Sequence, residues 1–211
     1  QSMFIHPAGH LVLSSAVGTI ANHGPPRHLL AMHPEGGTPE GMSFVGPQIV
    51  PPRGFFGGSG EAHATAYDGL AASPDGKWIY VATNIEGWSF DKHRKHAVFR
   101  VSWTDQTLGE PFLGKAEAGD DDEHFNGPQG VAVDAAGNLY VADRGNNRVM
   151  VFSADGKLLG RFAVDKPQVI AVHPKTGAIY VVGRPPGASH KIPGCTLSKF
   201  SAFRDGKAEL Q

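Results

Sequence analysis

Cysteine and long hydrophobic runs are the features that this sequence most clearly lacks. The chain of 211 residues has one cysteine, Cys195, which excludes an intramolecular disulfide, a zinc site built on CxxC and haem attachment through CxxCH. No run of about 18 apolar residues occurs, so we expect no membrane span. The formal net charge is -1, which gives no general attraction for nucleic acid, so we expect no DNA partner.

Glycine and proline, by contrast, are plentiful, with 28 and 16 residues. Both residue types favour turns over long helices, which is typical of a chain with many short strands. Hydrophobic residues make up 40% of the chain and charged residues 18%, which is enough for a buried core and argues against intrinsic disorder. We therefore expect an all-β protein.

A hairpin pattern recurs along the chain. Each copy has a short apolar run, a tight turn that contains glycine, and a second β-rich run. The four turn glycines are Gly9, Gly76, Gly137 and Gly177. The first run of each copy ends in a polar residue that we expect to bond to the turn backbone. These residues are His6, Ser73, Asp134 and His173.

Two further β-rich runs, NRVMVFS and KLLGRFA, follow the third hairpin, so one unit has four strands. A four-stranded sheet cannot bury both of its faces alone, but sheets stacked around an axis cover one another. The repeat therefore predicts a β-propeller of four-stranded antiparallel blades. Residues 125–162, FNGPQGVAVDAAGNLYVADRGNNRVMVFSADGKLLGRF, resemble an NHL repeat over their whole length, and the other three units resemble it more loosely.

The NHL resemblance implies a propeller that closes with about six blades, whereas this chain supplies about four. Their expected bounds, within a single propeller segment 1–211, are 1–66, 67–126, 127–165 and 166–211. Open ends would expose a sheet face and strand edges. We therefore expect an incomplete propeller that is completed by chain outside these residues or by a partner protein.

The residue before the first strand of each blade points into the central channel in related propellers. That place is held here by Gln1, Asp68, Gln129 and Gln168. The chain more distantly resembles the peptidylamidoglycolate lyases, which place zinc-binding histidine there, and the gluconolactonase and senescence-marker-protein propellers, whose Glu, Asn and Asp bind a divalent cation. Only Asp68 matches the second pattern, and no histidine matches the first. One carboxylate among amides is a poor ligand set for Ca²⁺ or Zn²⁺, so Asp68 is either a metal or substrate ligand or a residue that caps strand ends beside channel water.

Two insertions carry the residues that we expect to touch a partner. The first, residues 34–60, is rich in glycine and proline but includes Phe55 and Phe56, which favour packing on a partner, on the rim of the blade itself or, as a lid, on a ligand. The second includes Trp88, Arg94 and Lys95, a combination typical of an exposed loop, a protein contact or an RNA site. The net charge makes RNA the least favoured of these.

The run Asp120-Asp121-Asp122-Glu123 is interpreted as a solvated loop, because a Ca²⁺ loop alternates its ligands and ends in a bidentate Glu. The motifs GxSxG, GxxxxGK, GxGxxG and HExxH are absent. We expect a non-catalytic, cofactor-free propeller that acts as a protein-binding scaffold or as a subunit of a larger assembly. The alternative is a metal-dependent lactonase-like or lyase-like enzyme with one Ca²⁺ or Zn²⁺ at Asp68. A chain that starts at Gln1 favours a secreted or periplasmic location.

Overall fold

The computed structural model of the chain describes residues 3–13, 29–32, 42–45, 69–83, 96–103, 111–183 and 194–211. Their strands form four separate antiparallel sheets, which we call sheets A to D in chain order. Sheet A contains β1 (Met3–Ile5), β2 (Leu11–Leu13), β3 (Leu29–Met32) and β4 (Met42–Val45). Sheet B contains β5 (Gly69–Ala72), β6 (Trp78–Thr83), β7 (His96–Ser102) and β8 (Leu113–Lys115).

Sheet C contains β9 (Pro128–Val133), β10 (Leu139–Asp143), β11 (Arg148–Phe152) and β12 (Leu158–Ala163). Sheet D contains β13 (Pro167–Val172), β14 (Ile179–Gly183) and β15 (Thr196–Phe200). A short 3-10 helix, η3 (Arg144–Asn146), joins β10 to β11. No helix in the described part of the chain is long and apolar enough to span a bilayer.

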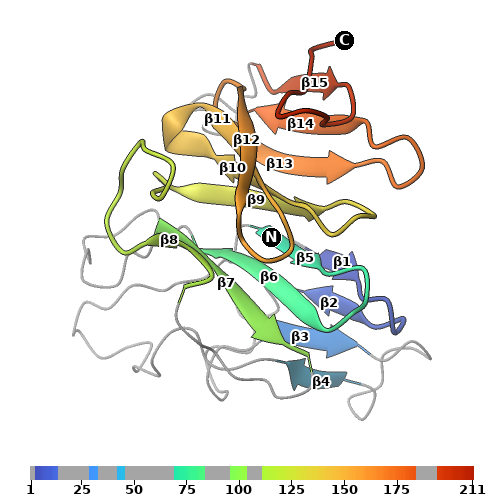
Figure 1. Ribbon diagram of the computed structural model, residues 1–211. Coiled ribbons are helices and arrows are strands. Elements are labelled where there is room, and N and C mark those ends of the chain that lie inside the picture. Colours follow the sequence, from blue (N-terminus) through green and yellow to red (C-terminus); the bar gives the residue numbers. More distant parts are fainter. Residues whose placement is uncertain are drawn as a thin grey trace.

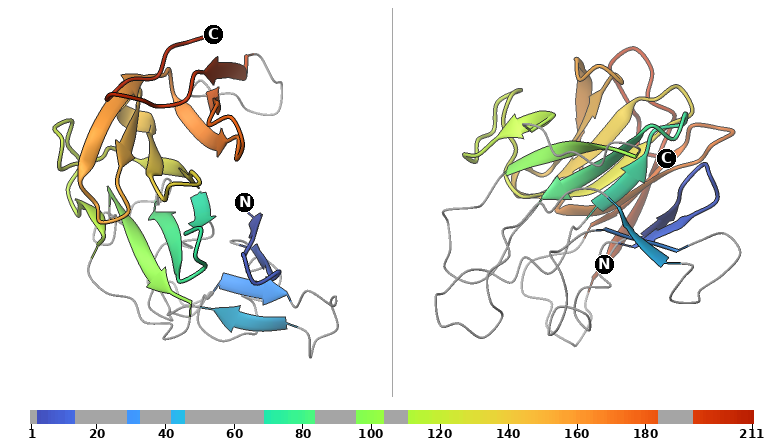
Figure 2. Two further views of the ribbon diagram at one scale, coloured as in Figure 1. Left: turned by 45° about the vertical axis from the view of Figure 1, so that its right-hand side comes forward. Right: turned by 90° about the horizontal axis from the view of Figure 1, so that it is seen from below.

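Strands that follow one another in the chain are hydrogen-bonded neighbours in every sheet (Figure 1). Figure 2 shows the sheets as an arc that is open on one side, with sheets A and D at its two ends. The first strands, β1, β5, β9 and β13, lie on the inside of the arc, and the later strands lie outside. This radial arrangement confirms the predicted all-β propeller.

The turns between the first and second strands follow the expectation from the sequence. The four turn glycines have φ between 70° and 91°, a region that suits glycine because it has no Cβ. The polar residue that precedes each turn bonds to it. Asp134 Oδ1 accepts from the backbone N–H of Ala136 and Asn138, and His173 Nδ1 accepts from those of Lys175 and Thr176.

In the part of the chain that the structure describes, the hydrophobic core forms three layers, each between two successive sheets. The layer between A and B includes Val12, Leu70 and Ile79. Tyr80, Phe125 and Met150 are among the residues of the layer between B and C, and Tyr140, Ile170 and Phe200 are among those between C and D. Each layer forms because alternate residues of a strand point to opposite faces of its sheet.

Sheet D differs from the expected four-strand plan, because three strands are hydrogen-bonded in it. The place of a fourth strand is taken by a short return of the chain alongside β15. Leu210 forms an isolated bridge with Phe200, and the N–H of Gln211 donates to the carbonyl of Lys199 at 2.8 Å.

Candidate functional site

The hub of the propeller is held by direct backbone contact between first strands. A Cβ atom built on Gly69 of β5 would lie 2.3 Å from the carbonyl oxygen of Gln129 in β9. A Cβ on Gly130 of β9 would lie 2.5 Å from the carbonyl oxygen of Gln168 in β13. Both distances are far below van der Waals contact, so glycine is what allows each sheet to approach the next one so closely.

Gln129 and Gln168 therefore occupy corresponding places at the start of β9 and β13, as the repeat implied. Gln129 is 5% exposed, and its Oε1 atom has no hydrogen-bond partner. Gln168 is half-buried. Among the described residues, no three His, Cys, Asp or Glu side chains gather closely enough to hold a metal ion. The described part of the hub thus offers amide groups, which fit poorly to Ca²⁺ or Zn²⁺ without several carboxylates or imidazoles.

The predicted residues Asp68, Phe55, Phe56, Trp88, Arg94 and Lys95 lie outside the described residues. The strands on either side nevertheless fix where their connections start and end. Residues 46–68 join β4 to β5, and residues 84–95 join β6 to β7. Because strands alternate in direction within a sheet, β4 and β6 end, and β5 and β7 begin, on the side of the arc where β9 and β13 begin.

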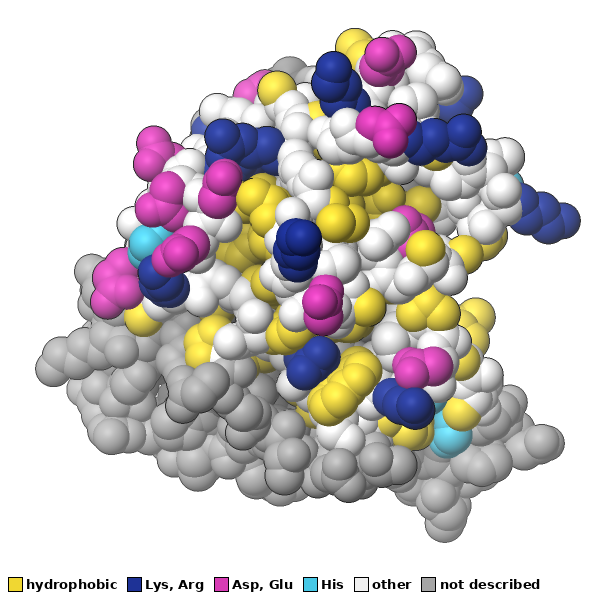
Figure 3. All heavy atoms as spheres, in the orientation of Figure 1, with side chains coloured by type: hydrophobic (Ala, Val, Ile, Leu, Met, Phe, Trp, Pro, Cys, Tyr) yellow, Lys and Arg dark blue, Asp and Glu magenta, His cyan; other side chains and the backbone are white. Residues whose placement is uncertain are grey.

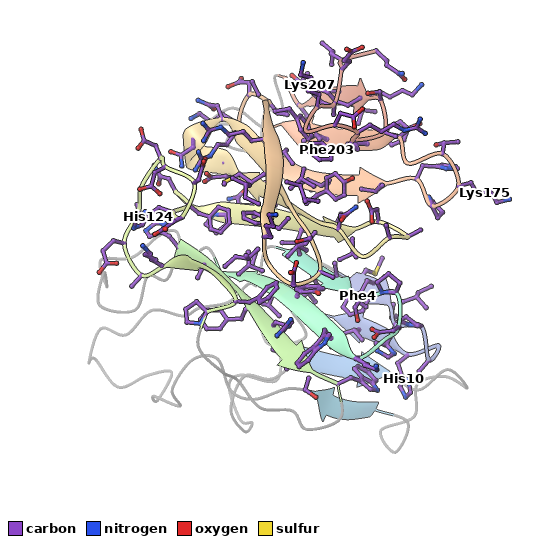
Figure 4. All side chains as sticks on the ribbon, viewed as in Figure 1. Phe4, His10, His124, Lys175, Phe203 and Lys207 are labelled. Atoms are coloured by element: carbon purple, nitrogen blue, oxygen red, sulfur yellow. The ribbon has the colours of Figure 1, made fainter. Side chains whose placement is uncertain are left out.

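The acidic run is exposed, as predicted for a solvated loop, but it is also firmly anchored. Arg148 donates from Nη1 to the carbonyl of Asp120 at 2.6 Å and from Nη2 to those of Asp121 and His124 at 2.8 and 2.9 Å. Figure 3 shows acidic side chains gathered on the side of the molecule where Figure 4 labels His124. No pattern in the sequence indicates this anchoring, because Arg148 is far from the loop along the chain.

A buried ion pair fixes Arg148 in turn. Its Nε donates to Oδ2 of Asp143 at 2.7 Å, and Asp143 Oδ1 accepts from the N–H of Asn126 at 2.7 Å. Burial raises the pKa of the Asp143 carboxyl, against the lowering effect of the hydrogen bonds from Asn126, Asn146 and Arg148. Nε, Nη1 and Nη2 of Arg148 together make four hydrogen bonds to protein oxygens, so this pair holds the loop in place.

His6 connects sheets A and B. Its ring stacks on Trp103 with a centroid distance of 3.8 Å, and Nε2 donates to the carbonyl of Gly76 at 2.7 Å. Nδ1 accepts the N–H of Ala8 at 3.1 Å, so the ring is neutral with its proton on Nε2. Burial lowers the pKa of His6, the bond to Gly76 opposes this, and the nearby His10 lowers the pKa further.

The outward faces of the two end sheets carry exposed apolar side chains. On sheet A, Met3 is 70% exposed and Ile5 is 74% exposed. On sheet D, Val169 is 53% exposed and Leu197 is 68% exposed. The strand pairing places Val169 opposite Val182, and Val182 opposite Leu197, so these three form one row across the sheet.

An open groove of about 810 Å³ lies beside this row. It is bounded by the β13–β14 turn, whose Lys175 projects at its tip in Figure 4, by β14 and β15, and by the chain after β15. Cationic side chains from Lys199, Arg204 and Lys207 line it, together with the carboxylates of Asp205 and Glu209. An exposed sheet face at an open end was expected from the sequence, but the residues of this row and groove were not identified. Val169, which stands where sheets B and C have glycine, was a usable signal.

Comparison with known proteins places this geometry among propellers. Residues 125–152 match the NHL repeat family. The human protein named NHL repeat-containing protein 3 is 36% identical over 80 residues, a match that covers 31% of this chain and 23% of that protein. The chain thus spans about a quarter of the length of this curated relative.

Solved structures that resemble the chain have unrelated functions. A gluconolactonase from Xanthomonas campestris superposes with a TM-score of 0.59 at 16% identity, over 99% of this chain and 56% of that one. A chain of a nidogen–laminin complex superposes with a TM-score of 0.59 at 14% identity, over 95% of this chain and 60% of that one. At such identities the likeness establishes the propeller fold and leaves the activity to the residues of the site.

Proposed function

We propose that the chain is a non-catalytic NHL-type propeller segment that binds other proteins, as a scaffold or as a subunit of a larger assembly. The observation that carries this proposal is the pair of open end faces with the exposed residues Met3, Ile5, Val169 and Leu197. Contiguous apolar surface on a folded protein marks a site of interaction. Within this molecule, the inner faces of the same sheets are buried by their neighbours.

The chemistry of the described hub supports binding over catalysis. Gln129 and Gln168 carry amides, which neither titrate nor attack a substrate. The buried charged groups of the described residues, Asp143 and Arg148, bind one another and backbone groups. A propeller in which these side chains hold loops in place suits a rigid platform for protein contacts.

A second candidate function is a metal-dependent lactonase-like or lyase-like enzyme with a channel site at Asp68. The observation that favours it is the buried Oε1 of Gln129, an oxygen without a partner close to the hub. The fold that the chain shares with a gluconolactonase is consistent with this alternative. In that case Asp68 would be one ligand of a divalent cation, and Gln129 would contact the substrate.

The two functions predict different assembly states and different activities for the protein. We expect the protein isolated gently from its natural source to sediment as a complex with other polypeptides, and the recombinant chain to hydrolyse no lactone with or without Ca²⁺ or Zn²⁺. Sedimentation velocity and a lactone-hydrolysis assay with a pH indicator measure the two outcomes. Metal-dependent turnover by a protein that sediments alone would contradict the proposal and favour the enzyme.

A further inference from the structure

Strand pairing shows that Arg100 of β7 breaks the residue pattern of the repeated sheets. In sheet C, Tyr140 of β10 lies opposite Val151 of β11, and both side chains are buried in the layer between sheets C and D. Tyr80 of β6 holds the place of Tyr140 in sheet B, but the residue opposite it is Arg100. Sheet B thus has a cation where the next sheet buries valine. Departures from a structural repeat are where a function is to be sought.

The guanidinium of Arg100 lies against two aromatic rings. Its Cζ atom is 4.3 Å from the ring centroid of Trp78 and 4.3 Å from that of Phe112. All three side chains are half-buried. Two such contacts stabilise the cation and restrict its side chain to few rotamers. Its five N–H donors remain directed outward from the edge of the planar group.

No carboxylate of the described residues forms an ion pair with Arg100. Its charge does reach the hydroxyl of Tyr80, because burial raises the pKa of that hydroxyl and Arg100 opposes the rise. The buried Arg148, by contrast, binds both Asp143 and the carbonyls of the acidic loop. A half-buried cation that is held in place without an anion favours the binding of an anion from outside.

This place lies between two sheets that are both present. Trp78 begins β6, so the place is on the side of the arc opposite to the one where β9 and β13 begin. The turn between β11 and β12 borders it, because a Cβ built on Gly156 would lie 3.3 Å from the ring of Phe112. Strands added at either open end of the arc would pack on sheet A or sheet D and therefore do not cover Arg100.

The charge around Arg100 favours an anion with a single charge. The two bordering turns, residues 73–77 and 153–157, each contain one Asp and one Lys and so add no net charge. Arg100 is then the excess charge of this place. A carboxylate balances one cation, whereas a phosphate group at neutral pH brings nearly two negative charges.

The shape and the apolar surroundings of Arg100 indicate the same class of ligand. The edge of a guanidinium matches the planar edge of a carboxylate, which it can bind through two parallel N–H donors. The rings of Trp78 and Phe112 beside it suit the methylene groups of an acidic side chain. Trp and Arg are also enriched among the residues that carry most of the binding energy of protein interfaces.

We propose that Trp78, Arg100 and Phe112 form a binding site for a Glu or Asp side chain of a partner protein. Arg100 binds the carboxylate through its paired donors, and the two rings contact the methylene groups of the same side chain. The inference rests on the proposed function and deepens it by naming the place where a partner is held and the residue type that is recognised there.

NMR titration with short peptides tests the site. Acetylated and amidated tri-glutamate is the probe, and tri-glutamine with the same end groups is its neutral match. We expect tri-glutamate to shift the Nε–H resonance of Arg100 and the indole N–H resonance of Trp78, and tri-glutamine to shift neither. Inorganic phosphate at equal ionic strength should cause smaller shifts than tri-glutamate.

Substitution of Arg100 separates binding from packing. Arg100→Lys keeps the charge without the paired donors, and Arg100→Met keeps the apolar stem. Both should weaken the binding of tri-glutamate, followed through Trp78, at least about tenfold. Arg204→Met is the matched control, because Arg204 is exposed and its substitution changes the net charge equally, and it should leave the binding unchanged. Circular dichroism verifies that the variants are folded, and the titration of the parent protein does not depend on them.

Several outcomes would overturn the inference. These are unchanged resonances of Arg100 and Trp78 with tri-glutamate, larger shifts with phosphate, and binding that survives Arg100→Met. The chain also has acidic residues of its own near the site in sequence, Asp105 and Glu110. Much tighter binding of tri-glutamate by the double variant Asp105→Asn with Glu110→Gln would mean that a carboxylate of this chain occupies the site, which overturns the inference as well.

The sedimentation experiment distinguishes failure of this site from failure of the proposed function. If the titration contradicts the site but the protein sediments as a complex with other polypeptides, the protein-binding function stands and only this site is wrong. If the protein also sediments alone, both fail.

Discussion

His6 is the residue whose surroundings predict a dependence of stability on pH. Its pKa is lowered in the fold, chiefly by burial. Just below pH 6.5 the unfolded chain therefore binds a proton at His6, whereas the folded chain binds it only at a lower pH. This contribution is complete above pH 6.5 and is lost as the pH falls from there towards the lowered pKa of the folded state. Protonation would also break the bond from Ala8 to Nδ1.

We therefore expect the free energy of unfolding to fall below pH 6.5, and to fall less steeply in a His6→Gln variant. Urea unfolding at a series of pH values measures both slopes. His173→Gln is the matched control, because His173 also accepts bonds from its turn but is exposed. If the free energy of unfolding falls with decreasing pH as steeply in His6→Gln as in the parent, titration of His6 does not weaken the contact between sheets A and B.

Arg148 illustrates how much one side chain can hold in place. An Arg148→Met variant removes the partner of the buried Asp143 and leaves three loop carbonyls without their donor. We expect a loss of about 3–5 kcal/mol in the free energy of unfolding, the usual cost of leaving one charge of a buried pair alone.

Arg161→Met is the comparison for this variant, because Arg161 pairs with Asp122 at the exposed surface. Its loss should not exceed about 1 kcal/mol. Urea denaturation at neutral pH measures both values. Equal losses for the two variants would mean that the loop is not organised by Arg148.

At the scale of the strand, the close contact between first strands predicts how replacing a hub glycine changes the stability of the protein. In a Gly130→Ala variant the new Cβ would lie 2.5 Å from the carbonyl oxygen of Gln168, so sheets C and D must move apart. We expect a loss of about 1–3 kcal/mol, the range for overpacked sites. Thermal unfolding followed by circular dichroism detects the change.

Val169→Ala alters the equivalent position of sheet D, where the side chain is 53% exposed. It should change the stability of the isolated chain by about 0.5 kcal/mol or less, as surface substitutions do. A Gly130→Ala variant as stable as Val169→Ala would indicate that the hub tolerates wider spacing between its strands.

The elements also show where reasoning from sequence succeeds. The hairpins were predictable because their signals, a turn glycine and a polar residue such as Asp134 just before the turn, lie within a few residues of one another. The anchoring of the acidic loop by Arg148 was not predictable, because the loop carbonyls that it binds precede it by more than twenty residues. Alternation does not identify the open row on sheet D either, since it gives the same pattern for a covered face and for an uncovered one. The one signal in the sequence is Val169, which stands where sheets B and C have glycine.

For the whole molecule, the two candidate functions predict different responses to cations. A channel metal site would stabilise the folded chain, by about 2.7 kcal/mol when the free ion is present at a hundred times its Kd. The described residues contain no cluster that could bind the ion. The proposed protein-binding function predicts that Ca²⁺ and Zn²⁺ leave the melting temperature unchanged.

Differential scanning calorimetry with chelator and with each cation measures this response. An Asp68→Asn variant provides the control, because it removes the one carboxylate that the sequence offers at the channel position. A melting temperature that rises with Ca²⁺ in the parent but not in the variant would favour the enzyme over the scaffold.

The strand directions have a consequence for how the chain can diverge. On the side of the arc where β9 and β13 begin, the single turn η3 connects β10 to β11. The pairing of these two strands therefore does not depend on a longer connection. In sheets A, B and D the second and third strands are joined on this same side of the arc. The equivalent connections are residues 14–28, 84–95 and 184–193. Insertions and deletions can accumulate there without shifting any strand register, so new specificities can evolve on that edge while the hub glycines stay fixed.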